Sequence, residues 1–244
     1  MMVSLKFSLM IMVLVFFGTV IGGGLAKFIS TTLRGNSRYL LLFCGGILAG
    51  LLLLDLIPES IHTYKPIGIV LGVTIGIIFM LLLHIATQNI KMFRVDQSTN
   101  YLLLFVALLF HGIPTGIALG MSYQNEQFQN PSLLLAILFH HVPEGMTMMV
   151  AVLISKFKLK TFFLLSLLLS FSIMVTTFIG SFINSDNLRL YTLFLGAAIG
   201  TLSYITFYEI LWKELKSSFT VKLIAFALSG MLFYYFYHIT VFQH

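Results

Sequence analysis

Residues 131–154 read PSLLLAILFHHVPEGMTMMVAVLI, a stretch that consists mostly of apolar side chains. A helix that crosses the hydrocarbon core of a bilayer needs about 20 consecutive, mostly apolar residues. This stretch is long enough, and it contains no lysine, arginine or aspartate. His140, His141 and Glu144 lie in its middle, and such side chains can bind metal ions or carry protons. The stretch therefore predicts a membrane helix with a polar site inside it.

The rest of the chain has the same apolar character. Of its 244 residues, 59% are hydrophobic and 9% are charged, and its mean hydropathy is +1.01. These values are too apolar for a soluble globular domain. We expect an all-α integral membrane protein with a single transmembrane domain, residues 1–244. Eight helices are predicted to span the bilayer: residues 5–27, 39–61, 66–88, 101–122, 131–154, 161–183, 190–211 and 221–241.

The basic residues predict the orientation of these helices. Short cytoplasmic loops are enriched in lysine and arginine, and 11 of the 14 basic residues lie in alternate loops between the predicted helices. This pattern predicts a multi-pass protein of the cell membrane with both termini outside. The net charge of +6 reflects that orientation, and we expect no nucleic-acid partner. The eleven residues are Lys27, Arg34, Arg38, Lys91, Arg94, Lys156, Lys158, Lys160, Lys213, Lys216 and Lys222.

Ionisable side chains at membrane depth are costly, and they usually face the interior of a helix bundle and serve a function. His140 and Glu144 are four residues apart, so they lie on one helical face and can share an ion. Pro143 lies between them and removes a backbone hydrogen bond to Phe139. Transporters use such interrupted helices for their ion sites. These features predict that the helix is broken at an ion site.

A second segment copies this pattern. Residues 111–120, HGIPTGIALG, align with residues 140–149, HHVPEGMTMM, so that histidine, proline and glycine match in both. Two such helices suggest a repeat that faces a shared site. The alignment adds His111 to the candidate metal ligands.

A weaker similarity links two other predicted helices. Residues 46–59, GILAGLLLLDLIPE, and residues 200–213, GTLSYITFYEILWK, both place a carboxylate nine residues after a glycine. Asp55 therefore corresponds to Glu209. Together the two similarities predict eight helices in a 3+2+3 bundle of inverted repeats.

These motifs resemble those of the ZIP (Zrt/Irt-like) family of zinc and iron transporters, particularly its bacterial members. The resemblance rests on HGIPTG and HHVPEG and extends to LLLLDLIPES and GAAIGTLSYITFYEIL, so it covers essentially the whole chain. It implies eight helices with both termini outside. It also implies movement of a divalent metal ion into the cytosol, along a path between the second, fourth, fifth and seventh helices.

The same resemblance assigns roles to individual residues. His111, His140 and Glu144 correspond to ligands of the main transport site, and His141 corresponds to a position that often binds a second metal ion. The chain departs from the family pattern at Thr115, where bacterial members usually have glutamate, and at Gly112, where asparagine is common. We therefore leave open whether one or two ions bind. Asp55, Glu209 and Thr115 are expected along the pathway.

The predicted ligands, imidazoles and one carboxylate, restrict the metal ions that we expect without fixing which one is preferred. Imidazole and carboxylate suit Zn²⁺ and Fe²⁺, whereas Ca²⁺ and Mg²⁺ prefer sites made only of oxygen. Zn²⁺ is the expected substrate, with Fe²⁺, Mn²⁺ or another divalent ion as alternatives. We expect zinc as a transported ligand and no cofactor. The expected partners are the divalent metal ion and the lipid bilayer. Whether the chain forms a homodimer stays open.

Other classes of protein share some of these residues. An intramembrane metalloprotease requires His-Glu-x-x-His on one helical face, and that string is absent from the sequence, so we expect no enzyme. A membrane protein that binds haem between two histidines stays open. So does a ZIP-like metal sensor that does not transport, because the helix that contains His111 lacks the usual glutamate.

Overall fold

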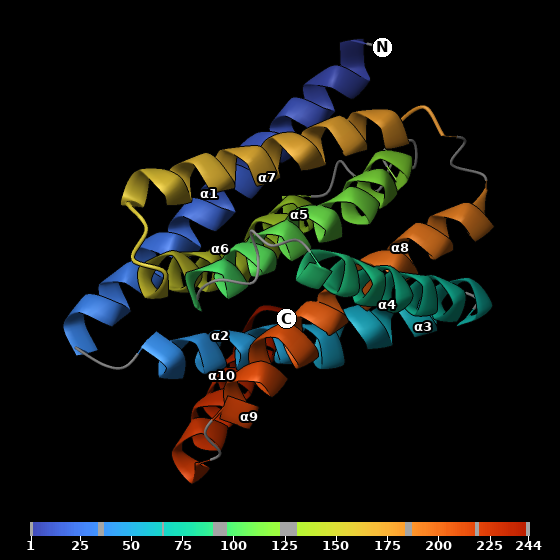
Figure 1. Ribbon diagram of the computed structural model, residues 1–244. Coiled ribbons are helices and arrows are strands. Elements are labelled where there is room, and N and C mark those ends of the chain that lie inside the picture. The colour runs from blue at the N-terminus through green and yellow to red at the C-terminus, as the bar shows by residue number, and fades with distance from the viewer. Residues whose placement is uncertain are drawn as a thin grey trace.

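The computed structural model describes residues 2–33, 37–64, 66–89, 97–122, 131–183, 187–217 and 220–242, and every regular element within them is a helix (Figure 1). The helices form eight rods at the eight predicted places. They are α1 (Met2–Leu33), α2 (Ser37–Leu51) continued by η1 (Leu52–Leu56) and α3 (Ile57–Thr63), α4 (Pro66–Asn89), α5 (Gln97–Ser122), α6 (Pro131–Ile154), α7 (Leu159–Gly180), α8 (Leu188–Ser203) continued by η4 (Tyr204–Trp212) and α9 (Lys213–Ser217), and α10 (Val221–Phe242).

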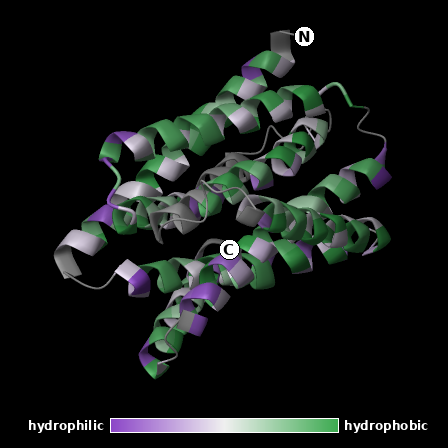
Figure 2. Cartoon of the chain, in the orientation of Figure 1, coloured by the Kyte–Doolittle hydropathy of each residue, from purple (hydrophilic) through white to green (hydrophobic). Residues whose placement is uncertain are grey.

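Seven of these rods are long and apolar enough to cross a membrane, counted within the described residues. The remaining predicted span, the fifth in chain order, is α6, a helix of 24 residues. The side chains of its residues 131–138 lie outside the described part. Large apolar side chains such as Val70, Leu82 and Phe236 are exposed on the outer surfaces of the rods. Figure 2 shows apolar residues along the helices and hydrophilic ones mostly near the helix ends. The protein is therefore a multi-pass membrane protein.

The rods pack mainly in four pairs: α1 with α6, α5 with α7, α2 with α10, and α4 with α8. The pair of α1 and α6 depends on glycine. A Cβ atom at Gly145 would overlap the backbone of Thr19, and one at Gly22 would overlap the carbonyl oxygen of Val142. Small residues let membrane helices approach this closely. The segment around Glu144 is thus held tightly against α1.

The predicted helix breaks do not occur at the prolines. Pro114 lies inside the continuous helix α5, and Pro143 lies inside the continuous helix α6. A proline removes its own backbone hydrogen bond, yet the neighbouring turns can keep the helical path when other helices pack around them. This correction concerns only the backbone, because both prolines still lie beside the predicted ligands.

Irregular backbone occurs instead in two π-helical segments that the sequence did not predict. The segment η1 continues α2 and contains Asp55, and the segment η4 continues α8 and contains Glu209. Stretches of π-helix are rare and occur frequently at functional sites. Asp55 and Glu209, which the alignment of residues 46–59 with residues 200–213 paired, therefore lie in the same unusual type of helix.

Candidate metal site

Three side chains from α5 and α6 converge in the interior of the bundle. The Nε2 atom of His111 lies 3.4 Å from Oε1 of Glu144, and the Nε2 atom of His140 lies 3.4 Å from the same oxygen. All three ligand atoms lie within 4.8 Å of one another. The side chains of His111 and Glu144 are 3% and 1% exposed, whereas that of His140 is 16% exposed. The structure therefore brings together the three residues that the motifs predicted as ligands.

These distances suit a metal ion better than direct hydrogen bonds. In a tetrahedral zinc site with bonds of about 2.0–2.1 Å, neighbouring ligand atoms are about 3.3 Å apart. Moreover, Oε1 of Glu144 is buried and has no hydrogen-bond partner among the described residues. A buried polar atom without a partner is uncommon in proteins and calls for an explanation. A cation between this oxygen and the two imidazoles would supply its missing partner.

The ring of His111 is oriented by the neighbouring helix α8. Its Nδ1 atom lies 3.0 Å from the carbonyl oxygen of Ala198 and 3.0 Å from the hydroxyl oxygen of Thr201. A carbonyl oxygen only accepts, and the Thr201 hydroxyl donates to backbone carbonyls of its own helix. Nδ1 therefore carries the proton, and in the neutral ring Nε2 presents a lone pair toward Glu144. Such hydrogen bonds on the far side of a histidine are typical of metal ligands.

The sequence analysis did not identify Ala198 and Thr201. The carbonyl of Ala198 is a backbone group that any residue would offer, so no sequence signal could have found it. Thr201 follows Gly200 in the GAAIGTLSYITFYEIL segment, but a threonine in a membrane helix usually donates to its own backbone. Only the packing of α5 against α8 brings its hydroxyl to His111.

His141 contacts the other oxygen of the same carboxylate. Its Nδ1 atom lies 2.8 Å from Oε2 of Glu144, and its side chain is 1% exposed. Because an ionised carboxylate only accepts, the Nδ1–H group of His141 donates to it. This hydrogen bond fixes the rotation of the Glu144 carboxylate and leaves Oε1 turned toward His111 and His140.

Thr115 lies one turn after His111 and lines the same site. Its hydroxyl donates to the backbone oxygen of His111 at 3.0 Å and lies 3.4 Å from Nε2 of that ring. A neutral oxygen thus occupies the position where bacterial members of the resembled family usually place a carboxylate. It can offer a weak ligand or hold a water molecule at the site.

A cavity of about 640 Å³ connects the site with one end of the bundle. At that end Glu59 is exposed, and deeper inside the hydroxyl of Tyr234 donates to Oδ2 of Asp55 at 2.9 Å. Asp55 lines the same cavity as His111, His140 and His141. Its polar and ionisable lining residues are Asp55, Glu59, His111, Thr115, Ser122, His140, His141, Tyr191, Tyr234, Tyr237 and His238.

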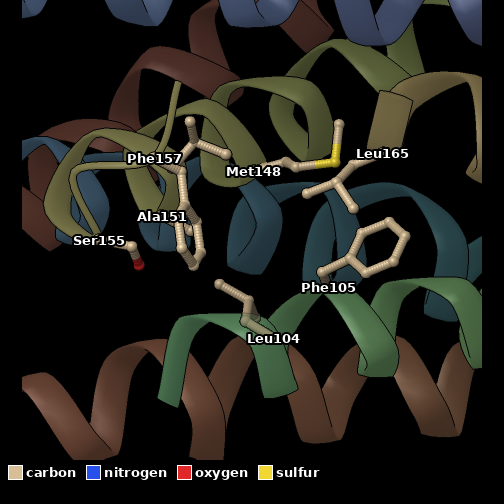
Figure 3. Close-up of a pocket in the computed structure, with 8 residues that line it drawn as sticks. Leu104, Phe105, Met148, Ala151, Ser155, Phe157 and Leu165 are labelled. Atoms are coloured by element: carbon tan, nitrogen blue, oxygen red, sulfur yellow. The ribbon is translucent and has the colours of Figure 1, made fainter. Parts of the chain in front are cut away.

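Toward the opposite end, apolar side chains fill the space beside the site. Leu108, Met148 and Leu202 lie about one helical turn beyond the site on their own helices and are buried in one apolar cluster. Figure 3 shows the neighbouring packing, in which the Phe105 ring lies beside Leu165. These two residues, with Leu104 and Met148, line a cavity of only about 10 Å³. The site is accessible from one end and separated from the other by this apolar layer.

Glu209 does not belong to this cavity. Its carboxylate contacts Nδ1 of His84 at 3.1 Å and Nζ of Lys213 at 2.6 Å. It lines a separate, small cavity beside α4 and α5. The sequence comparison paired Glu209 with Asp55, but the structure places the two carboxylates in different cavities.

The helical bundle and the largely buried cluster of His111, His140 and Glu144 define a class of protein: a polytopic membrane protein with a candidate internal site for a cation. A family model described as ZIP Zinc transporter matches residues 93–237, more than half of the chain. The chain therefore belongs to the ZIP zinc transporter family, whose members move divalent metal ions and are not enzymes. Among curated proteins, none matches the chain.

Proposed function

We propose that this protein carries Zn²⁺ across the cell membrane into the cytosol and that His111, His140 and Glu144 bind the ion during passage. One observation carries the proposal: the buried Oε1 atom of Glu144 lacks a hydrogen-bond partner among the described residues and faces two imidazole nitrogens at 3.4 Å. Two imidazoles and one carboxylate suit Zn²⁺ and also Fe²⁺. Fe²⁺, Mn²⁺ and other divalent ions are the alternative substrates. In this proposal zinc is a transported ligand, and the protein needs no cofactor.

Haem binding between the two histidines fits this geometry poorly. Oε1 of Glu144 lies 3.4 Å from both Nε2 atoms, so a carboxylate oxygen occupies the space that a macrocycle between the rings would need. The rings of His111 and His140 are 6.3 Å apart, measured between centroids. A small ion fits among the three groups without displacing Glu144.

The inverted repeat gains support from the packing of the helices. In a 3+2+3 repeat, the first three rods correspond to the last three, and α5 corresponds to α6. The contact of α1 with α6 then corresponds to that of α7 with α5, and the contact of α2 with α10 corresponds to that of α8 with α4. These four pairs have the most extensive contacts between helices. The single transmembrane domain of residues 1–244 is proposed on the same ground.

The predicted orientation places the large cavity on the outer side. The ends of α3 and α5 and the start of α8 then lie outside, because the basic loops lie inside. Asp55 and Glu59 line the route by which an ion reaches His140 from outside. The apolar layer beyond His111 has to open before release, so relative movement of the repeats supplies alternating access. Both termini outside and a homodimer stay predictions.

Uptake of radioactive zinc into liposomes that contain the purified protein tests the proposal. We expect uptake by the native chain and a loss of more than about tenfold in His140→Ala and in Glu144→Ala. His62→Ala is a matched control, because His62 is exposed at the end of α3. Native vesicles that bind zinc but do not accumulate it would instead support a sensor.

A further inference from the structure

A cluster of lysines lies where α6 turns into α7. Residues 156–160 read KFKLK, and all five side chains are exposed. No aspartate or glutamate occurs in residues 145–185. Within the described part of the chain, Lys156, Lys158 and Lys160 form no salt bridge. Three positive charges therefore lie at one end of the bundle without a counter-charge from the protein.

A fourth lysine lies at the same end, on α1. A Cβ atom at Gly23 would overlap the ring of Phe162, so α1 and α7 touch at these two residues. Lys27 lies one turn beyond Gly23 on the same face of α1, and Lys158 is the N-cap residue of α7, one turn before Phe162. Both helices reach the same end of the bundle there (Figure 1). Lys27, which is exposed, adds its charge to the cluster.

An apolar face of α7 continues from the cluster. Lys160 lies in the first turn of α7, and the residues that follow it at helical spacing are exposed. Figure 2 shows hydrophilic residues at the start of α7 and mostly apolar ones along the rest of the helix. Because α7 is long and apolar enough to cross a membrane, this face contacts lipid. The exposed residues are Phe163, Leu164, Leu167, Leu168 and Phe171.

The end of α6 holds the turn that carries the cluster. The backbone N–H of Lys156 donates to the oxygen of Leu153 at 3.2 Å, and that of Phe157 donates to the oxygen of Val152 at 3.1 Å. These two bonds close a helix at a residue with positive φ, a position that glycine usually takes. Here Lys156 has a φ of 55°. The charge therefore lies where backbone geometry alone favours glycine.

Phe157 joins the cluster to the interior of the bundle. Its side chain lines the small cavity of Figure 3 together with Leu104 and Met148. Met148 belongs to the apolar layer that separates the metal site from this end. Because Phe157 lies between Lys156 and Lys158 in the chain, a ligand that holds the two lysines also holds Phe157 against this layer.

We propose that Lys156, Lys158 and Lys160, together with Lys27, bind the headgroup of an anionic phospholipid whose acyl chain lies along the exposed apolar face of α7. Lysine clusters next to a membrane helix attract anionic headgroups. An acidic protein segment matches the charge alone, whereas a phospholipid matches both the charge and the apolar face. In the predicted orientation this lipid belongs to the cytoplasmic leaflet, whose surface potential is negative. The proposal does not depend on which ion is transported.

The lipid also reduces repulsion within the turn. Three like charges within five residues repel one another, and in a bilayer of neutral lipids only water and salt screen them. An anionic phosphate group neutralises part of this charge. The turn and the apolar face exist together only in the folded chain, so a lipid that binds both stabilises the folded state. We therefore expect anionic lipid to stabilise the protein more than neutral lipid does.

Native mass spectrometry of the full chain, released from detergent micelles, tests the binding. Phosphatidylglycerol is the anionic probe and phosphatidylcholine the neutral one. The native chain should retain phosphatidylglycerol in preference. Lys158→Gln with Lys160→Gln should lower the affinity for phosphatidylglycerol by more than about tenfold, because each lysine near an anionic surface contributes about fivefold. The affinity for phosphatidylcholine should not change.

Lys216→Gln with Lys222→Gln is the matched control, since it removes two exposed lysines from another loop on the same predicted side. Its affinity for phosphatidylglycerol should stay close to that of the native chain. Equal losses in the two double variants would overturn the proposal, as would equal retention of both lipids by the native chain. Inorganic phosphate should not displace the lipid, because it lacks an acyl chain. Displacement at equal concentration would overturn the assignment to a lipid.

Thermal unfolding separates the proposal from damage to the fold. With phosphatidylcholine alone, the Lys158→Gln, Lys160→Gln variant should unfold at the native temperature or above it, because repulsion is reduced. Added phosphatidylglycerol should raise the unfolding temperature of the native chain and leave that of the variant unchanged. A native chain that gains no more stability from phosphatidylglycerol than from phosphatidylcholine would contradict the proposal. Neither measurement involves zinc, so failure here is distinguishable from failure of zinc transport.

Discussion

The Nδ1 atom of His111 lies 3.0 Å from the carbonyl oxygen of Ala198, which joins the candidate ligand on α5 to the backbone of α8. The hydroxyl of Thr201 reaches the same nitrogen at 3.0 Å. These contacts keep the proton on Nδ1 and turn the lone pair of Nε2 toward Glu144. A helix that provides no metal ligand therefore determines whether His111 can act as one.

Thr201→Val should weaken zinc binding while leaving the ligands in place. The substitution keeps the shape of the side chain but removes one of the two acceptors for His111. Loss of a hydrogen-bond partner behind a metal ligand typically costs about 10–100-fold in affinity. Because the Ala198 carbonyl remains, we expect the lower end of that range, about tenfold, in equilibrium dialysis with Zn²⁺.

Thr201→Ser is the matched variant, since it keeps the hydroxyl and removes a methyl group. It should bind zinc with nearly native affinity. Equal losses in the serine and valine variants would show that packing of Thr201, rather than its hydrogen bond, matters for His111.

His141→Ala should reduce affinity without removing the site. The Nδ1–H group of His141 donates to Oε2 of Glu144 at 2.8 Å and so orients the carboxylate. We expect about a 10–100-fold loss of zinc affinity with the number of bound ions unchanged. His140→Ala, in contrast, removes a ligand. If His141→Ala lowers the number of bound ions per chain, His141 is itself a ligand of a second ion.

Asp55→Asn should affect capture more than passage. Asp55 lines the large cavity and accepts a hydrogen bond from Tyr234, so it attracts cations before they reach the histidines. We expect a KM for zinc uptake that is raised several-fold, with a maximal rate close to that of the native chain. The effect should shrink as the salt concentration rises. A large loss of maximal rate would place Asp55 among the groups that bind the ion during transport.

Gly22→Ala tests the packing that holds the motif helix. A Cβ atom at Gly22 would overlap the carbonyl oxygen of Val142, whereas one at Gly24 on the same helix would meet no atom within 4 Å among the described residues. Overpacking of this kind costs about 1–3 kcal/mol. Gly24→Ala lacks that cost and gains about 0.5–1 kcal/mol of helix stability. Thermal unfolding in detergent should therefore occur at a lower temperature in Gly22→Ala and at an unchanged or higher one in Gly24→Ala.

The sequence predicted those parts of the site that depend on local spacing. His140 and Glu144 are four residues apart, and this spacing alone puts them on one face of a helix. His111 was found through the repeated motif. The position of His84 beside Glu209 depends on how α4 packs against η4, and no spacing in the sequence encodes it. The sequence could not predict the π-helical segments either, because their backbone conformation depends on contacts with neighbouring helices.

The expected breaks at the prolines were wrong for a related physical reason. The sequence shows that Pro114 and Pro143 cannot donate a backbone hydrogen bond, but it does not show how the surrounding helices support the chain there. In the structure α5 and α6 stay continuous. The candidate ligands on α5 and α6 still converge, without a break in either helix at its proline.

Thr115→Glu should change the balance between binding and release at the main site. The Thr115 hydroxyl lies 3.4 Å from Nε2 of His111, so a carboxylate at this position reaches the same ion. A further negative ligand strengthens the attraction for a divalent cation in a buried site. We expect tighter zinc binding in dialysis and a lower maximal uptake rate in liposomes. Thr115→Val is the control that removes the hydroxyl without adding charge, and it should bind zinc no more tightly than the native chain. If Thr115→Glu transports as fast as the native protein while it binds more tightly, release from the main site does not limit the rate, and the slow step lies at the apolar layer between His111 and Glu209.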